Sequence, residues 1–366
     1  MRKPARRFPT LALLLFTSPW LCASRALAAP PTAAPSTAAA EWNQFRGPDR
    51  SGVSHETGLQ RSWPEEGPKI LWRRPLGEGF SGLSVVGERL CTMFALEEEE
   101  YLGCFNATTG EPLWRTAIGG KFHEMFGNGP RATPTIDGDT LYAVGGKGRV
   151  VAADLATGAI RWQLELSERY GIYDPQTLNP MATQEGLQLP LYGYSGSPLV
   201  EGDLLVVETG ARHGRSVVGL DKKTGAEIWT ALDDEIGYSS PIAVEIGGRR
   251  QILLLPGTSI VALAPSGEVL WRHGWELTPS QPLFVPPDKI FVSTVSGVGA
   301  VLLQVGPEDA PNRITEVWKI QRLKNAWNSS IIAGGHLYGF DNATLRCVSL
   351  ADGSLAWAAR GLGRAR

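Results

Sequence analysis

One short motif recurs along the chain and constrains its fold more than any other feature. A turn ending in glycine is followed, four residues later, by a tryptophan that closes an apolar run. Successive tryptophans of this kind lie roughly 40 to 50 residues apart, with one interval of about 67. A supersecondary unit repeated at this period is typical of a β-propeller with one blade per repeat. The clear copies are Asn106–Trp114, Asp154–Trp162 and Asp221–Trp229, and the weaker ones are Ala264–Trp271 and Leu350–Trp357.

Each repeat reads as four short strands. In the second unit, β-rich runs at 132–136, 140–144 and 149–153 are separated by Gly-containing turns, and an outer strand carries Trp162. Short runs of this composition between Gly and Asp turns are typical of hairpins. We therefore predict an all-β propeller of four-stranded blades over residues 42–366. Six complete repeats are visible, at about 81–116, 131–164, 194–231, 238–273, 281–320 and 327–359.

The repeated tryptophans are expected to lock each blade to the next, because a large aromatic ring fills the gap between two packed sheets. The segment 69–74 reads as an outer strand that has no hairpin before it. We expect it to complete a final blade contributed by the C-terminus, which would close the ring. The tryptophans in register are Trp72, Trp114, Trp162, Trp229, Trp271, Trp318 and Trp357.

The first 28 residues read as a signal peptide. A basic segment at 2–7 precedes an apolar run at 11–20, and Ala26-Leu27-Ala28 is typical of a cleavage site. The apolar run is shorter than the roughly 20 residues of a spanning helix, so no membrane span is expected. Residues 29–41 are rich in Pro and Ala and read as a linker. We expect a soluble periplasmic or secreted protein, exported by either the Sec or the Tat route.

The charge balance argues against a nucleic-acid partner. The chain has 35 Lys and Arg against 37 Asp and Glu, and removal of residues 1–28 takes away five basic residues and no acidic ones. The remaining net charge is about −7, whereas binding to phosphate needs clustered Lys and Arg. We therefore expect a partner of another kind.

Four segments resemble a known family of exported bacterial propellers. They are Trp42–Asp49 (WNQFRGPD), 128–134 (NGPRATP), 193–198 (GYSGSP) and 237–241 (GYSSP). Together with the repeats, they make the chain similar to the pyrroloquinoline-quinone-like (PQQ-like) propeller repeat proteins, a superfamily of BamB-like and quinoprotein-like propellers. Such relatives usually have seven or eight blades. The resemblance therefore implies either a chain truncated at its C-terminus, which we favour, or a ring closed with fewer blades.

The resemblance leaves two classes of function open. BamB-like relatives bind protein partners. Quinoprotein dehydrogenases use PQQ with Ca²⁺ held by carboxylates and amides, and many alcohol dehydrogenases add a disulfide of adjacent cysteines. This chain has no adjacent cysteine pair, and its sequence suggests no catalytic or metal-ligating cluster. We expect a non-catalytic scaffold that needs no cofactor and binds a protein, peptide or small polar ligand. A PQQ- and Ca-dependent oxidoreductase, or a degenerate quinone-binding relative, is the alternative.

A binding site is expected at the mouth of the central channel, on the loops that enter the innermost strands. These entries combine aromatic and hydroxyl side chains, with one arginine in the second blade. Either they bind a ligand, or the aromatics pack the channel wall and the hydroxyls cap strand ends. Two long loops, 117–130 and 165–193, are further places for function. The candidate residues are Phe80, Ser81, Arg131, Tyr194, Ser195, Tyr238, Ser239 and Trp327.

Two cysteines are expected to face each other across the first hairpin. If Phe94 pairs with Tyr101, Cys91 lies opposite Cys104. An oxidising compartment would favour a disulfide between them, and the alternative is a pair of small buried thiols. The acidic run at 97–100 forms the tip of this hairpin and reads as solvated.

Overall fold

The computed structural model of the chain describes residues 41–171, 181–184, 187–310 and 313–362. Residues 38–366 form one compact unit. The expected signal peptide at 1–28 lies outside the described residues, as does the expected linker up to residue 40. Within the described part of the chain, no helix is both long and apolar enough to cross a bilayer.

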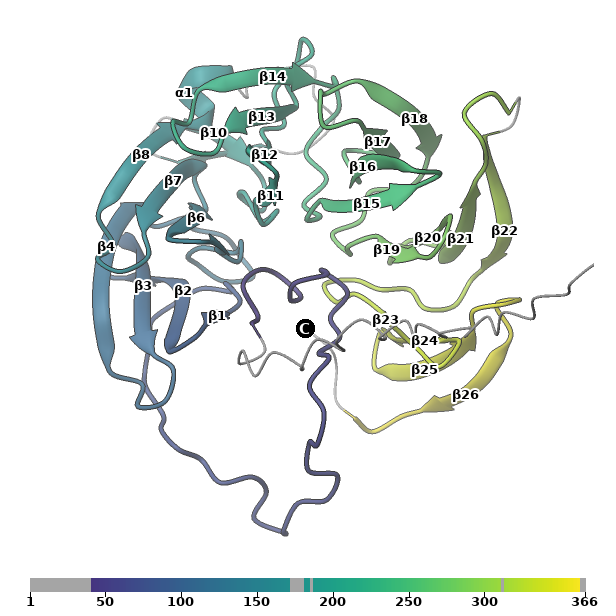
Figure 1. Cartoon of the computed structure of the whole chain (residues 1–366), viewed down its shortest axis with the longest axis horizontal. Coiled ribbons are helices and arrows are strands. Elements are labelled where there is room, and N and C mark those ends of the chain that lie inside the picture. The colour runs from purple at the N-terminus through teal and green to yellow at the C-terminus, as the bar shows by residue number, and fades with distance from the viewer. Residues whose placement is uncertain (1–40, 172–180, 185–186, 311–312, 363–366) are drawn as a thin grey trace, which may run out of the picture. The chain divides into compact units, whose positions relative to one another are not determined.

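Six four-stranded antiparallel sheets make up this unit, and each keeps its strands in sequence order. They follow one another around a central segment, residues 42–51 (Figure 1), which confirms the predicted propeller fold and its six repeats. The sheets are β1 Ser84–Val86, β2 Arg89–Leu96, β3 Glu99–Asn106 and β4 Pro112–Gly120; β5 Thr135–Asp137, β6 Thr140–Val144, β7 Arg149–Asp154 and β8 Ile160–Glu165; β11 Leu199–Glu201, β12 Leu204–Glu208, β13 Val217–Asp221 and β14 Glu227–Ala231; β15 Ile242–Ile246, β16 Arg249–Leu254, β17 Ser259–Leu263 and β18 Val269–Gly274; β19 Leu283–Val285, β20 Lys289–Ser293, β21 Ala300–Val305 and β22 Ile314–Ile320; and β23 Ile331–Ala333, β24 His336–Asp341, β25 Thr344–Ser349 and β26 Leu355–Ala359.

The long loop between the second and third blades carries its own secondary structure. A short helix, α1 Leu166–Tyr170, follows β8 directly. A two-stranded hairpin, β9 Met181–Gln184 with β10 Leu187–Pro190, comes next. These elements account for the longer spacing between repeats at this point.

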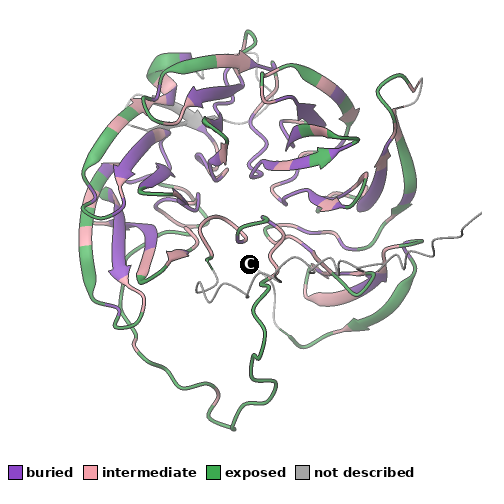
Figure 2. Cartoon of the chain, in the orientation of Figure 1, coloured by how far each residue is buried: buried purple, intermediate pink, exposed green. Residues whose placement is uncertain are grey.

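Burial follows the radial order of the strands. The second and third strands of the first five blades are largely buried, whereas outer strands such as β4 and β8 consist mainly of exposed and half-buried residues. Figure 2 shows the same gradient from the buried middle strands to the exposed perimeter. The largest apolar cluster runs through the first three blades without interruption. The core therefore lies between neighbouring blades, because each sheet buries both faces against its neighbours.

The outer-strand tryptophans contact the next blade in a repeated way. The indole Nε1 of Trp114 donates to the carbonyl of Leu155 at 3.0 Å, and Trp162 donates in the same way to Lys222 at 3.0 Å. Trp229 and Trp318 make the equivalent bonds to the carbonyls of Pro265 and Leu350. Each acceptor belongs to the glycine turn of the following blade. The turn glycine lies against the ring and has positive φ, so it also permits the close approach.

Two of the seven tryptophans depart from the expected role. Trp271 is buried, and its Nε1 donates to Oε1 of Gln251 in its own sheet at 2.8 Å. The following blade has a different loop after β21, without the glycine turn that accepts the other indoles. Trp357 lies on β26, where its side chain is 44% exposed. Among the described residues, no further sheet follows β26 to cover it.

A β-bulge recurs between the third and fourth strands of every blade, next to the tryptophan. In the third blade the register shifts after Gly219 pairs with Trp229, so one outer residue has no partner. The residue opposite the tryptophan is small in most blades: Cys104, Ala152, Gly219, Ala262 and Cys347. Only small residues (cysteine, alanine or glycine) stand opposite the tryptophan in these five blades, because a larger side chain would meet the indole.

The segment around Trp72 docks on the first blade without forming a strand. Its Nε1 donates to the carbonyl of Ala107 at 3.0 Å, and its ring lies against Gly110, as in the other blades. Residues 69–74 have no strand assignment, in contrast to the expected outer strand, because no neighbouring strand among the described residues pairs with them. The position between β26 and the first blade thus contains an outer segment without inner strands (Figure 1).

The family-like segment Trp42–Asp49 and the residue after it, Arg50, belong to the central segment, which lies between the innermost strands (Figure 1). Arg50 is buried and donates to the carbonyls of Pro198 and Pro241, in the third and fourth blades, and to Thr135 in the second. Arg46 donates to the carbonyl of Ser330 in the sixth blade at 2.6 Å. Burial lowers the pKa of Arg50 to about 9 and that of Arg46 to about 10. This central segment therefore links blades that are far apart in sequence.

Candidate functional site

Two of the three predicted hydroxyls join successive blades, and the third bonds within the first blade. Ser195 donates from Oγ to the carbonyl of Tyr238, and Ser239 donates to that of Ser280, both at 3.1 Å. Oγ of Ser81 accepts from the backbone N–H of Met93. These bonds use the three predicted hydroxyls within the fold, which favours strand capping over ligand contact for Ser81, Ser195 and Ser239.

The predicted aromatics divide into buried and exposed residues. Tyr194 is buried, and its hydroxyl donates to the carbonyl of Thr209 at 3.2 Å. Tyr238 is also buried, and burial raises the pKa of both hydroxyls. In contrast, Phe80 is 59% exposed and Trp327 is 58% exposed. The two tyrosines thus belong to the wall, whereas Phe80 and Trp327 face solvent.

The long loops add two aromatic residues beside this exposed pair: Phe126, which is exposed, and Tyr192, which is half-buried. Phe126, from loop 117–130, is 63% exposed and lies 6.1 Å from Trp327 between ring centroids. Tyr192, from loop 165–193, lies 6.2 Å from Phe126 and 6.0 Å from Trp327. Phe80 lies against Gly127, the residue that follows Phe126. We call Phe80, Phe126, Tyr192 and Trp327 the aromatic surface.

Arg131 packs against the aromatic surface. Its guanidinium lies 5.5 Å from the ring centroid of Phe80 and 4.8 Å from that of Phe122. It also donates to the carbonyls of Gly127 and Gly129 and pairs with Glu124 at 3.2 Å. Desolvation lowers its pKa. Arg131 therefore fixes the loop that carries Phe126.

A polar network borders the same loop. Lys121 is buried and pairs with Glu78 at 3.3 Å and Glu98 at 3.4 Å. His123 hydrogen-bonds to Glu98 at 2.9 Å, and this bond is the main cause that lowers the pKa of that carboxyl. These contacts tie the loop to the hairpin tip of the first blade. The aromatic surface consequently rests on a braced loop.

A family model described as outer membrane protein assembly factor BamB matches residues 65–177 and 98–359. The chain belongs to this family. The outer membrane protein assembly factor BamB of Xanthomonas campestris pv. campestris is 28% identical over 171 residues, which are 45% of this chain and 32% of that protein. The quinoprotein alcohol dehydrogenase PedH of Pseudomonas putida is 27% identical over 202 residues, 53% of this chain and 29% of that protein. The chain thus spans about a third of the length of these curated relatives.

Solved structures confirm the fold of this BamB-family chain. BamB from Moraxella catarrhalis superposes with a TM-score of 0.51 at 16% identity, covering 79% of this chain and 77% of that structure. A europium-containing methanol dehydrogenase gives a TM-score of 0.58 at 13% identity, covering 82% and 74%. At these identities the likeness establishes the propeller architecture and leaves function to the site itself.

The donor set of a calcium–quinone site is not assembled in the described part of this BamB-family chain. No three His, Cys, Asp or Glu side chains there come together in a way that could hold a metal. Ca²⁺ takes six to eight oxygen ligands, usually with several carboxylates. Glu124 pairs with Arg131, and Glu208 accepts from the backbone N–H of Gly237. The described carboxylates therefore do not gather into a Ca²⁺ site of that kind.

Two buried carboxyls were not found by sequence reasoning. Glu208 is buried at the end of β12, and burial raises its pKa to about 7. Glu100 was expected at a solvated hairpin tip, but it is buried and accepts from the backbone N–H groups of Phe122 and Gly146. Burial raises its pKa as well. Only Glu97, Glu98 and Glu99 of the acidic run are exposed.

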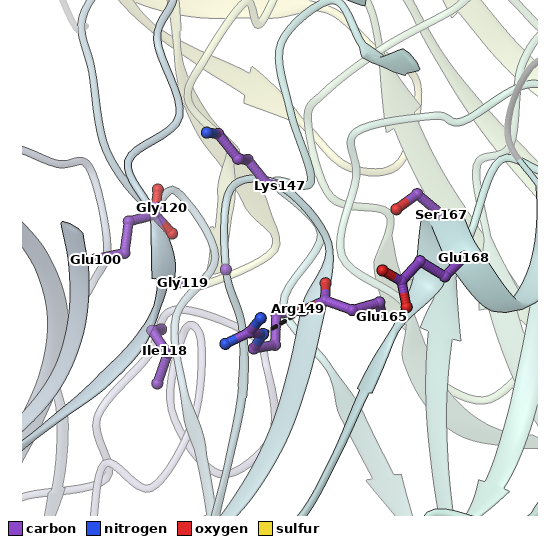
Figure 3. Close-up of a pocket in the computed structure, with 10 residues that line it drawn as sticks. Glu100, Ile118, Gly119, Gly120, Lys147, Arg149, Glu165, Ser167 and Glu168 are labelled. Atoms are coloured by element: carbon purple, nitrogen blue, oxygen red, sulfur yellow. Dashed lines mark hydrogen bonds and ion pairs between the residues drawn. The ribbon is translucent and has the colours of Figure 1, made fainter. Parts of the chain in front are cut away.

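Glu100 lines a crevice between the first and second blades (Figure 3). Arg149 and Glu165 form an ion pair in it, and Lys147 also lines it. The volume of the crevice, about 160 Å³, is below the roughly 300 Å³ of the smallest ligand pockets. We interpret this crevice as a joint between blades.

Cys91 and Cys104 are joined by a disulfide across the first hairpin. Phe94 pairs with Tyr101 and Cys91 with Cys104, which is the register considered from sequence. Cys347 is a buried free thiol.

Proposed function

We propose that this chain is a non-catalytic propeller scaffold that binds a protein or peptide partner through its aromatic surface. The observation that carries the proposal is that Phe126 lies beside Trp327, and Phe80 against Gly127, while all three aromatic side chains remain more than half exposed. Contiguous exposed aromatics usually mark interaction sites, because leaving them in water has a free-energy cost that binding removes. Trp and Tyr are also the residues that dominate binding energy at interfaces.

The family relationship supports a protein partner. The matching family model and one relative are described as an outer membrane protein assembly factor. By analogy, we propose that this chain acts in the periplasm or outside the cell, within an assembly of proteins. Its predicted signal peptide agrees with that location.

Peptide selection with matched variants tests the proposal. A random peptide library displayed on phage is panned on the purified chain, and the selected peptides are synthesised. Trp327→Ala should weaken their binding at least about tenfold, because removal of a central aromatic anchor typically costs 2 kcal/mol or more. Trp63→Ala is the control, since Trp63 is 56% exposed outside the aromatic surface. Equal losses in both variants, or none in Trp327→Ala, would refute the proposal.

Quinone binding is a second candidate, favoured by the 27% identity to a quinoprotein alcohol dehydrogenase over 53% of the chain. Titration with PQQ plus Ca²⁺ tests it, followed by tryptophan quenching and dye-linked dehydrogenase activity. Micromolar binding with turnover would replace the scaffold proposal. Binding without turnover would indicate a degenerate quinone-binding relative, and no binding by the folded chain would leave partner capture as the function.

A further inference from the structure

The chain's own central segment pairs with the innermost strands of the first two blades. Trp42 exchanges backbone hydrogen bonds with Val85 of β1, at 2.9 and 2.8 Å. The carbonyl of Asn43 accepts from the N–H of Ile136 in β5 at 2.7 Å, and its side-chain amide donates to the Ile136 carbonyl at 3.0 Å. Trp42 and Asn43 thus pair with two successive blades, one residue to each blade.

Hairpin geometry explains why these two residues offer free backbone groups. Val85 pairs with Leu90, and Ile136 pairs with Leu141. In each hairpin the next pair along the strand is the one that closes the two-residue turn. In such hairpins the closing pair exchanges hydrogen bonds, so the N–H and C=O of the preceding residue point away from the partner strand. On an innermost strand that direction is toward the channel.

Four more residues hold the same place in the other blades. Val200 pairs with Leu205 and Ile332 with Leu337, in the same register from a two-residue turn. Ala243 and Phe284 stand two residues after Pro241 and Pro282, as Ile136 stands two after Pro134. In the part of the chain that the structure describes, none of the four has a backbone hydrogen bond outside its own sheet.

These four positions line one cavity of about 660 Å³. The volume lies within the roughly 300–1,000 Å³ of ligand pockets. Its walls are largely apolar, and residues 48–51 of the central segment form one side. Two ion pairs border it, Asp49 with His55 at 2.7 Å and Arg250 with Glu201 at 2.7 Å. The cavity thus continues, over the third to sixth blades, the path that Trp42 and Asn43 occupy over the first two.

We propose that this cavity binds an extended apolar peptide segment of a partner protein, whose backbone pairs with the free strand edges at Val200, Ala243, Phe284 and Ile332. An apolar molecule alone would leave these N–H and C=O groups without partners, whereas a peptide backbone supplies both a donor and an acceptor at each residue. The same chemistry already acts at Val85 and Ile136.

The edges are also held in place before binding. Arg50 donates to the carbonyls of Pro198 and Pro241, which immediately precede β11 and β15. Ser197 donates its N–H to Oγ of Ser240 at 2.9 Å, joining the same two strand entries. Binding to a fixed edge loses less conformational entropy than binding to a mobile one. This site shares no residue with the aromatic surface and does not depend on it.

A pair of synthetic peptides tests the proposal without altering the protein. The probe is a fluorescein-labelled heptapeptide of alternating Val and Thr, and its control carries N-methyl groups on alternate residues. Fluorescence anisotropy with the full chain should show saturable binding of the first peptide. N-methylation should weaken it at least about tenfold, because it removes backbone donors and blocks strand pairing. Equal binding of both peptides, or no saturable binding of the first by about 1 mM, would overturn the proposal.

Variants locate the site. Val200→Pro removes an N–H that faces the channel, a position where an edge strand tolerates proline, and should weaken the peptide about tenfold. Val200→Thr keeps the backbone and shape and should bind within about twofold. Ala243→Phe fills the cavity and should also abolish binding, so the test survives if the proline variant does not fold. Trp327→Ala should leave this peptide unaffected, and a loss there would assign the peptide to the aromatic surface and refute the cavity.

Discussion

Replacement of Glu208 by glutamine should change how the stability of the fold depends on pH. The carboxyl is buried, and its Oε2 accepts from the N–H of Gly237 at 3.1 Å. Its Oε1 has no hydrogen-bond partner among the described residues. Burial without a cation beside it disfavours the charged form, which is why its pKa rises from 4.5 to about 7.

The sign and size follow from linkage between protonation and folding. Because the pKa is raised in the folded state, the folded protein binds the proton more tightly than the unfolded chain does. This contribution to stability is fully present below about pH 4.5 and is lost as the pH rises through about 7. A tenfold change in acidity corresponds to about 1.4 kcal/mol, so the contribution amounts to about 3 kcal/mol.

Denaturant unfolding at about pH 4.5, 6 and 8, followed by tryptophan fluorescence, measures the effect. The free energy of unfolding of Glu208→Gln relative to wild type should increase with pH, by up to about 3 kcal/mol between the ends of this range. Glu88→Gln serves as the control, because Glu88 is exposed. Parallel pH profiles for wild type and Glu208→Gln would refute the reasoning.

Two further predictions concern stability. The free energy of unfolding of the Cys91→Ala/Cys104→Ala double variant should fall by about 3 kcal/mol, because the disulfide closes a loop with a sequence separation of 13. Denaturant unfolding measures this loss, and reduced wild type should match the variant. Gly225→Ala should lower the free energy of unfolding by about 3 kcal/mol, because the new Cβ would lie 2.7 Å from the Trp162 ring. Gly202→Ala is the control: its φ is similar but the space around it is open, so the loss should be about 1 kcal/mol. Thermal unfolding compares the two variants, and equal losses would contradict the argument that the indole docks on Gly225.

The blades could be predicted from sequence because their determinants are local. The turn glycine, the strand runs and the tryptophan all lie within one repeat, so the six sheets follow from the pattern alone. The departures at Trp271 and Trp357 depend on the following blade, which lacks the accepting turn in one case and is not present among the described residues in the other. Contacts within a repeat were predictable, and contacts between repeats were predictable only where the neighbour keeps the motif.

The candidate site was predictable only in part. Phe80 and Tyr194 occupy equivalent places before an innermost strand, yet one is exposed and the other is buried. The difference comes from neighbouring loops: Tyr194 lies against Gly148 of the second blade, whereas Phe80 faces solvent above Gly127. Phe126 and Tyr192 lay in loops that sequence analysis marked for function, and their aromatic character could have signalled them. Their convergence required knowledge of the fold.

Glu100 illustrates a different limit. Its neighbours in sequence are exposed acids, so local composition indicates a solvated tip. The residue is buried because β3 carries it to the interface with the second blade, where the N–H of Gly146 donates to it across 46 positions. A Cβ at Gly146 would lie 2.8 Å from this carboxylate, so the pair depends on both residues. No local pattern encodes a contact of this range.

Trp72 shows that the indole can dock on the next blade without belonging to a strand. Residues 69–74 belong to no sheet, yet Trp72 makes the same bond to a turn carbonyl, at 3.0 Å, as Trp114, Trp162 and Trp318 make from paired outer strands. Arg74 adds a bond to the carbonyl of Gly110. The strand ladder is therefore not needed to place the indole, and the glycine turn specifies the docking position. This explains why the motif couples a turn in one blade to a tryptophan in the blade before it, and why blades can be added to such a fold one at a time.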